Sequence, residues 1–186
     1  MEIKKLILIG ASTGGPGQIQ KIVQSIRQKK DTAVIIAQHM QSSYLSSFAS
    51  QLDRNSPISV IISKKDLTIK TDTIYVLGNN FEIKNRGRNL VFDKYHQQLS
   101  YSPNIDLLFN SVSNLQKKPN IMCIVLTGIG DDGAKGALSL AKIGAICINE
   151  SESSSIVYGM PKAASELNPS AKQLGIDEIC NEIRSF

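Results

Sequence analysis

The sequence of 186 residues lacks any hydrophobic run near the roughly 18 residues that a membrane-crossing helix requires. Its first apolar stretch is only five residues long and follows two lysines. That stretch is too short for the apolar region of a signal peptide, and no credible cleavage site follows it. These absences predict a cytoplasmic protein without membrane insertion.

Cysteine is scarce, with only Cys123, Cys147 and Cys180 in the chain. The number is odd, and no two of these residues form a Cys-x-x-Cys pair. Both facts argue against a disulfide framework or a zinc site, and each cysteine falls in an apolar segment. We therefore expect buried, reduced thiols rather than a disulfide or a zinc site. For the protein as a whole we expect no bound metal and no cofactor.

The chain has an excess of basic residues, with a formal net charge of +5. This charge permits an acidic partner, but the lysines and arginines are scattered and no aromatic residues are interleaved with them. The lysine pairs fall near the ends of predicted elements, where solvated charge is common. The sequence therefore predicts no nucleic-acid binding, and it does not indicate an oligomeric state.

Continuous apolar runs alternate with segments whose apolar residues repeat at helical spacing, which predicts buried parallel strands joined by helices. The expected strands are 4–10, 32–38, 58–64, 121–128 and 145–150. The expected helices are 16–30, 42–54, 104–118, 132–144, 160–167 and 176–186. This order predicts an α/β fold, namely a doubly wound, mostly parallel sheet with helices on both faces.

The middle of the chain has a different pattern. Segments 73–80, 81–95 and 97–102 alternate apolar and polar residues, and Arg86-Gly87-Arg88 can supply a turn. These features predict an antiparallel ribbon at an edge of the sheet. No linker or internal repeat interrupts the chain, so we expect a single domain over residues 1–186.

A glycine-rich bend follows the first predicted strand, in LILIGASTGGPG (6–17). The spacing Gly10-x-Ser12-x-Gly14 is typical of a nucleophile elbow, in which a sharp turn exposes a serine beside a helix N-terminus. Two other interpretations stay open. The bend could bind phosphate, although the P-loop lysine is absent, or Ser12 or Thr13 could only cap the helix.

A serine nucleophile needs a base, and the chain has only two histidines. His39 directly follows the predicted strand 32–38. If that strand is parallel to the first, Ser12 and His39 both lie at carboxyl ends and their side chains can meet. His96 lies in a polar segment, and we expect it to be exposed.

A carboxylate that orients the histidine is available in a second glycine-rich bend, LTGIGDDGAKG (126–136). Asp131 and Asp132 both lie in this bend, and either one could instead cap a helix. The residues by themselves do not choose between them. Three strand ends that carry Ser, His and Asp favour acyl-transfer chemistry, in a chain order that differs from that of α/β-hydrolases.

The sequence resembles the catalytic domain of the bacterial chemotaxis-receptor methylesterases, the protein-glutamate methylesterase family. The matching stretches include IGASTGGP (9–16), AQHM (37–40), LTGIGDDGAKG (126–136), IGAICINE (143–150) and YGMPKAA (158–164). The resemblance implies a methylesterase catalytic domain that removes methyl groups from glutamate γ-methyl esters in the cytoplasmic region of chemotaxis receptors. It also implies deamidation of receptor glutamines as a second activity.

The resemblance assigns a role to each residue of the proposed catalytic triad. Ser12 matches the nucleophile, His39 the base and Asp132 the acid that orients it. Asp131 falls on a variable position of the family pattern.

Further positions near the site also follow from the resemblance. The backbone amides of Thr13 and Ile129 are implied to stabilise the oxyanion, and Gly14 and Met160 to lie near the site.

The chain departs from the family pattern at several positions. Gln41 replaces a frequent proline after Gln-His-Met, and Ser102-Pro103 replaces a frequent Arg-Pro. The family usually carries an N-terminal receiver domain, whereas Met1 here directly precedes the first predicted strand. Two alternatives to an enzyme remain, a phosphate-ligand binding domain and a catalytically inactive receptor-binding adaptor.

Overall fold

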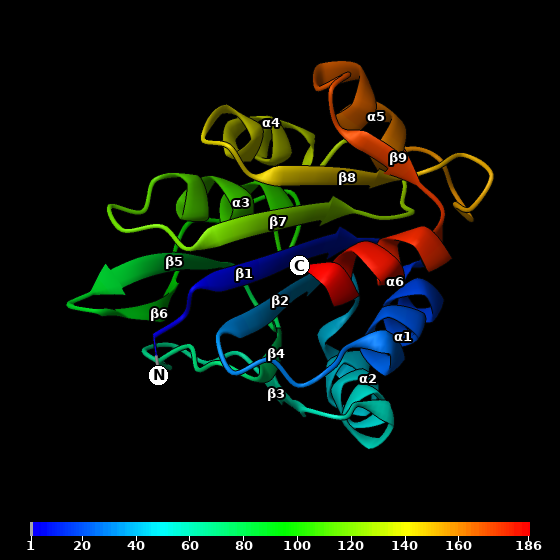
Figure 1. The fold of residues 1–186 in the computed structure, drawn as a ribbon. Coiled ribbons are helices and arrows are strands. Elements are labelled where there is room, and N and C mark those ends of the chain that lie inside the picture. Colours follow the sequence, from blue (N-terminus) through cyan, green and yellow to red (C-terminus); the bar gives the residue numbers. More distant parts are fainter. Residues whose placement is uncertain (1) are drawn as a thin grey trace.

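The computed structural model describes residues 2–186 and contains a seven-stranded sheet flanked by helices (Figure 1). Met1 lies outside the described residues. All neighbouring strands of this sheet are parallel, in the order β3-β4-β2-β1-β7-β8-β9. The strands are β1 (Lys5–Ala11), β2 (Thr32–Gln38), β3 (Ser59–Ile62), β4 (Thr73–Val76), β7 (Asn120–Val125), β8 (Ile146–Glu150) and β9 (Lys172–Leu174).

The direction in which strands are added reverses at β1. The chain first builds β2, β3 and β4 on one side of β1 and then returns to place β7, β8 and β9 on the other. Open parallel sheets bind ligands at the carboxyl ends of the strands that flank such a reversal. We therefore expect the functional site at the carboxyl ends of β2, β1 and β7.

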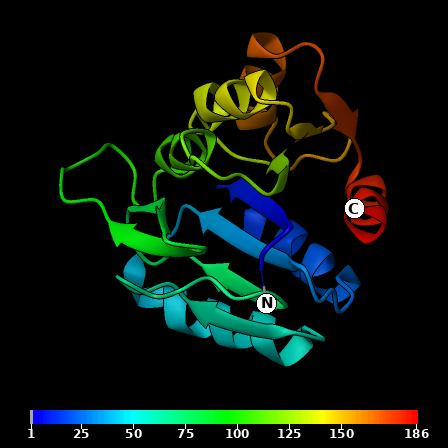
Figure 2. The same cartoon turned by 60° about the vertical axis from the view of Figure 1, so that its left-hand side comes forward.

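Helices cover both faces of the sheet, as Figures 1 and 2 show. One face carries α1 (Gly15–Ser25), α2 (Ser42–Asn55) and α6 (Ile176–Ser185), and the other carries α3 (Ile105–Ser113), α4 (Ala134–Lys142) and α5 (Met160–Leu167). A hydrophobic core lies on each face of the sheet, and β1 contributes side chains to both. Leu6 and Leu8 pack on one face and Ile7 and Ile9 on the other. The predicted α/β fold class is confirmed.

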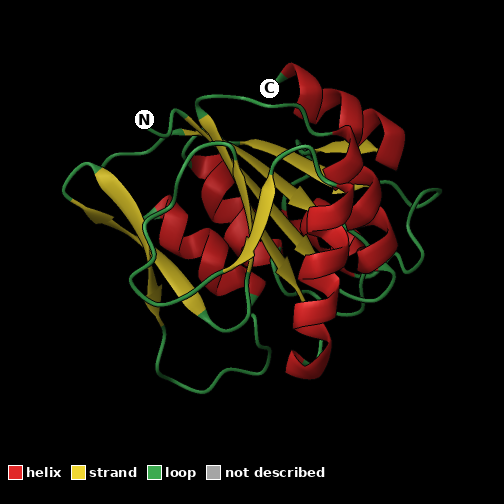
Figure 3. Ribbon diagram, turned by 90° about the horizontal axis from the view of Figure 1, so that it is seen from below, coloured by secondary structure: helices red, strands yellow, loops and turns green. Residues whose placement is uncertain are grey.

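The antiparallel ribbon is present, but it does not extend an edge of the large sheet. Strands β5 (Phe81–Arg86) and β6 (Asn89–Lys94) form a separate two-stranded sheet, with Gly87 at a positive φ of 63° in the turn (Figure 3). Ile83 and Phe92 of the ribbon are buried in the core on the α3 side. The ribbon therefore covers part of the sheet face on the α3 side.

The prediction that segment 73–80 belongs to the ribbon is wrong. Its residues Thr73–Val76 form β4, which pairs in parallel with β2 and β3 inside the large sheet. Ile74, Tyr75 and Val76 are all buried, because the sheet is covered on both faces. The segment reads as a mixture of apolar and polar residues because polar residues lie on both sides of its short apolar run, residues 74–77.

Several element boundaries differ from the expected ones. The first helix ends at Ser25, because Ile26 turns to an extended conformation (φ −63°, ψ 139°) while its side chain stays in the core. The helix expected over 104–118 ends at Ser113. The segment 97–102 forms bends rather than a strand.

Strand β9 has no counterpart among the predicted elements. It is a three-residue edge strand, Lys172–Leu174, and its exposed positions give it no apolar run. Its existence follows from pairing with β8 rather than from its own residues.

The state of the cysteines and the length of the apolar helices can both be checked in the structure. Cys123, Cys147 and Cys180 are buried free thiols. Within residues 2–186, no helix is both long enough and apolar enough to cross a bilayer.

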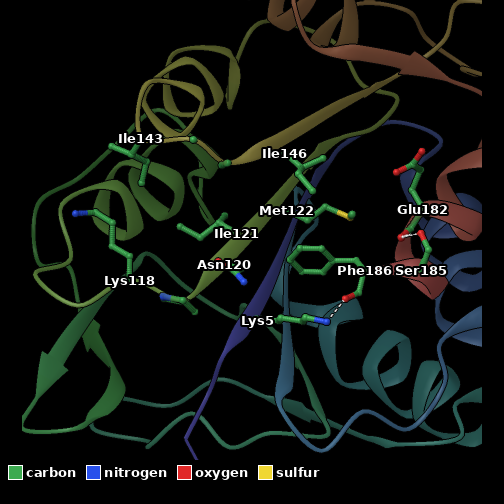
Figure 4. A pocket seen from close by; sticks show the side chains of 13 residues that line it. Lys5, Lys118, Asn120, Ile121, Met122, Ile143, Ile146, Glu182, Ser185 and Phe186 are labelled. Atoms are coloured by element: carbon green, nitrogen blue, oxygen red, sulfur yellow. Dashed lines mark hydrogen bonds between the residues drawn. The ribbon is translucent and has the colours of Figure 1, made fainter.

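A pocket lies at the amino ends of the strands. Lys5, Met122, Ile146 and Phe186 are among its lining residues (Figure 4). Because Lys5 and Ile146 are the first residues of β1 and β8, this pocket lies at the opposite end of the sheet from the predicted site.

Candidate functional site

Ser12 and His39 lie at adjacent strand ends. In the register of β1 and β2, Ala11 is opposite Gln38, so Ser12 and His39 are the first residues beyond the paired segment. The His39 amide donates a hydrogen bond to the Ala11 carbonyl, with a nitrogen–oxygen distance of 2.9 Å. The parallel arrangement expected for these two strands is confirmed.

The bend after β1 holds Ser12 by its backbone. The Ser12 amide donates to the Thr127 carbonyl at 3.0 Å, and the Ser12 carbonyl accepts from the Gly15 amide and the Gln38 side-chain amide, both at 2.9 Å. Gly14, at a φ of 83°, is the N-cap of α1, and no side chain caps this helix. The Ser12 hydroxyl is therefore not used as a helix cap.

The third strand end of the site is that of β7, whose following bend carries Asp132. The carboxylate of Asp132 lies 2.7 Å from His39 Nε2, measured from Oδ2. The same carboxylate accepts hydrogen bonds from the backbone amides of Ile105 at 2.8 Å and Asp106 at 2.9 Å, at the start of α3. These hydrogen bonds hold the Asp132 side chain in place, and only 4% of its surface is exposed.

Asp131 has a different environment from its neighbour. Its side chain is exposed, and its carbonyl accepts a hydrogen bond from the Ala134 amide at 3.0 Å. The structure thus places Asp132, and not Asp131, against His39.

A second carboxylate, Asp106, lies close to Asp132. Burial raises the pKa of Asp106, and the negative charge of Asp132 raises it further, while a hydrogen bond from the Gly136 amide opposes these effects. That bond, 2.6 Å long, ties the start of α3 to α4. Asp106 therefore helps to hold the helix whose amides contact Asp132.

The contact with Asp132 determines which nitrogen of His39 can act as a base. A neutral imidazole has one N–H and one unprotonated nitrogen, and a carboxylate partner requires the N–H at Nε2. This leaves Nδ1 unprotonated and able to accept a proton. Within residues 2–186 no hydrogen bond joins Ser12 Oγ to His39, and such contacts commonly tighten only when substrate is bound.

Two backbone amides beside Ser12 are available as donors. Within residues 2–186, the amides of Thr13 and Ile129 donate no hydrogen bond. Thr13 follows Ser12 directly in the bend, and Ile129 follows Gly128, where an added methyl group would lie 2.7 Å from Ser12 Cβ. Ile129 is 64% exposed, so its amide lies in an open loop rather than in the core.

Gly128 separates Ser12 from Met160. A methyl group built on Gly128 would lie 2.7 Å from Ser12 Cβ and 2.3 Å from Met160 Sδ. Met160 is fully buried, and its amide donates to the Gly128 carbonyl at 2.8 Å. Met160 therefore packs against Gly128.

Gly14 also lies at a close contact. A methyl group on it would fall 2.6 Å from Ile156 Cβ. Ile156 is exposed, so the loop after β8 borders the bend that carries Ser12.

Sequence reasoning missed the polar residues that support these loops. The Thr127 hydroxyl donates to the Thr13 carbonyl and accepts from the Val157 amide, both at 2.8 Å. Its amide donates at 2.9 Å to the buried carboxylate of Glu150, which also accepts from the Gln18 side chain. The signal available in the sequence was a polar residue at or just beyond the end of a buried apolar run, Thr127 after β7 and Glu150 at the end of β8.

Sequence reasoning also missed Tyr101. Its ring stacks on the imidazole of His39, with 4.6 Å between ring centroids and 6° between ring planes. Tyr101 lies in segment 97–102, whose pattern predicts part of a ribbon, so nothing in the local sequence indicated this contact.

The second histidine and a metal centre are not part of the site. His96 is exposed, as expected from its polar surroundings. Among residues 2–186, no group of three or more His, Cys, Asp or Glu side chains is arranged to hold a metal ion.

The close contacts of Gly128 lead to a prediction. We expect Gly128→Ala to slow the reaction of Ser12 with a fluorophosphonate probe by about a hundredfold, because misplacing a reacting group by about 1 Å can have that effect. The control is Gly17→Ala in α1, where a methyl group would meet nothing within 4 Å. This control should react normally, and an unchanged rate for Gly128→Ala would contradict the prediction.

Comparison with known proteins identifies the relatives of this chain. A family model described as CheB methylesterase matches residues 7–183. A protein-glutamate methylesterase/protein-glutamine glutaminase of Clostridium acetobutylicum is 34% identical, over 95% of this chain and 51% of its own length. A similarly named protein of Saccharophagus degradans is 32% identical, over 97% of this chain and 50% of its own length.

The chain thus spans about half the length of the curated relatives it matches. The crystal structure of the Thermotoga maritima CheB methylesterase catalytic domain superposes with a TM-score of 0.89 at 25% identity, covering 98% of both chains. A family match over nearly all of the sequence and a shared fold lead to one conclusion: this chain belongs to the CheB methylesterase family.

Proposed function

We propose that this chain is a cytoplasmic methylesterase catalytic domain, comprising residues 1–186, that hydrolyses glutamate γ-methyl esters in the cytoplasmic region of chemotaxis receptors. Membership of the family supports this activity, and relatives are named for it. The observation that carries the proposal is the partly buried His39–Asp132 contact at the strand end next to that of Ser12. A phosphate-binding loop or an inactive adaptor has no need of such a pair.

In the first half of the proposed reaction, Ser12 Oγ attacks the ester carbonyl while His39 accepts its proton through Nδ1. The carbonyl oxygen becomes negative and receives hydrogen bonds from the amides of Thr13 and Ile129. Asp132 stabilises the positive imidazolium and fixes its orientation. The C–O bond to methoxide then breaks, and the proton on His39 passes to the departing oxygen to give methanol.

In the second half, water replaces methanol. His39 removes a proton from water as its oxygen attacks the acyl-Ser12 ester, and the same amides hold the oxyanion. The bond between the acyl carbon and Ser12 Oγ breaks, and His39 returns its proton to Ser12 Oγ. The receptor is left with an unmodified glutamate side chain. A receptor glutamine follows the same path with ammonia leaving, which accounts for deamidation as a second activity.

The two histidines provide a matched test of this function. We expect the wild-type protein to release methanol from receptors that carry labelled methyl esters, and His39→Ala to lower the rate by at least about a thousandfold, because the base is lost. The exposed His96→Ala should retain the wild-type rate. Equal rates for the two variants, or no release by the wild-type protein, would contradict the proposal.

A further inference from the structure

The ring of Tyr101 contacts the proposed base in a way that the triad does not require. It lies parallel to the imidazole of His39, 4.6 Å away between centroids. Tyr101 is 38% exposed, so the ring is not held there as part of the hydrophobic core. An aromatic ring placed flat on a histidine at an exposed position indicates a contribution to the site rather than to core packing.

The loop that carries Tyr101 is anchored at the same helix that holds Asp132. Asn104, three residues further on, caps α3 by accepting a hydrogen bond from the Leu107 amide at 2.7 Å, and its own amide donates to Asn80 at 2.7 Å. The next two amides, of Ile105 and Asp106, bind the Asp132 carboxylate. One segment of chain therefore supports both the acid and the ring that covers the base.

Tyr101 also reaches the loop with the proposed oxyanion donor. A methyl group built on Gly130 would lie 3.2 Å from the Tyr101 hydroxyl oxygen. Gly130 has a φ of 92° and directly follows Ile129. The side chain thus spans the distance from the base to the turn that presents the Ile129 amide.

A single hydrogen bond at Nε2 leaves the imidazole free to turn about that bond. A flat ring on one face restricts this rotation and keeps Nδ1 directed at one position. The negative face of an aromatic ring also attracts a cation, and His39 becomes positively charged during the proposed reaction.

We propose that Tyr101 is a positioning residue for His39, which holds the imidazole plane so that Nδ1 faces Ser12 and which stabilises the imidazolium. This inference rests on the proposed function for its role in ester hydrolysis. The stacking itself, and its effect on Ser12 reactivity, can be measured without a receptor substrate.

The experiment compares Tyr101→Leu, which removes the ring, with Tyr101→Phe, which keeps it. Tyr101→Leu should lower the rate of Ser12 reaction with a fluorophosphonate by about tenfold, a size typical of one aromatic contact, and Tyr101→Phe should restore it. With methyl-esterified receptor, kcat should fall while KM stays unchanged. The control is Tyr95→Leu in the same loop, because the Tyr95 hydroxyl donates an exposed hydrogen bond to the Gln97 side chain.

A spectroscopic measurement tests the contact directly. The stacked ring should shift the proton resonances of the His39 imidazole upfield in the wild-type protein and in Tyr101→Phe, and this shift should disappear in Tyr101→Leu. If Tyr101→Leu unfolds at the assay temperature, Tyr101→Asn takes its place, because asparagine suits exposed loops.

The outcomes separate this inference from the proposed function. A ring-free variant that reacts at the wild-type rate overturns the positioning role, even where methanol release by the wild-type protein supports the esterase. A wild-type protein that releases no methanol, but whose Ser12 reactivity depends on the ring, overturns the esterase and leaves the positioning role supported.

Discussion

Ser12→Ala is expected to lower methanol release from methyl-esterified receptors by about four to six orders of magnitude, the size found when a serine nucleophile is removed. The reason is that the substitution removes the hydroxyl oxygen that is proposed to attack the ester and to form the acyl-enzyme. Thr13 is exposed on the next position of the bend, and its amide rather than its side chain is the part proposed to act. Any residual rate would come from the oxyanion donors and from substrate binding.

The measurement is the initial rate of labelled methanol release, with binding of receptor and thermal unfolding recorded for the same samples. Ser50→Ala in α2 serves as the control, because it makes the same chemical change at an exposed position away from the strand end. A Ser12→Ala protein that folds, binds receptor and still releases methanol at the wild-type rate would exclude Ser12 as the nucleophile.

Asp132→Asn is expected to lower the rate by about four orders of magnitude, whereas Asp131→Asn should have little effect. An asparagine cannot accept hydrogen bonds at both terminal atoms. One orientation of its amide places NH₂ against His39 and the Ile105 amide, and the other places it against the Asp106 amide. The first orientation also forces His39 to present the wrong nitrogen to Ser12.

The same argument predicts a loss of stability, because either orientation leaves a buried amide without an acceptor. We expect about 1–3 kcal/mol of unfolding free energy to be lost in Asp132→Asn, measured by denaturant unfolding. Asp131 is exposed, so Asp131→Asn should unfold like the wild-type protein. Equal rates in the two variants would show that the contact between His39 and Asp132 has no part in the reaction.

Local pattern is a good guide wherever a continuous apolar run forms a buried strand. The runs before Ser12 and His39 are recognisable as strands. The sequence predicts that the two side chains lie at neighbouring strand ends if these strands are parallel, and the register of β1 and β2 confirms that they are. The pattern fails at β4, whose four residues are too few to show a period, and at β9, which is an exposed edge strand.

The choice between Asp131 and Asp132 shows a different limit. Both residues suit a bend before a helix, and the pattern of the residues gives no reason to prefer either one; only the family resemblance does. In the structure the choice depends on α3, which begins 27 residues before Asp132 in the chain and points its first amides at that carboxylate.

The sequence by itself determined the α/β class of this protein, the parallel strands beneath the site and the three side-chain types that converge there. Those features depend on local burial and on turn chemistry, which neighbouring residues encode. Only the tertiary structure decided the place of the ribbon on a sheet face, the amides that hold Asp132 and the stacking of Tyr101 on His39. Each of these is a contact between segments far apart in the chain, and such contacts are set by how the crossovers pack rather than by any local pattern.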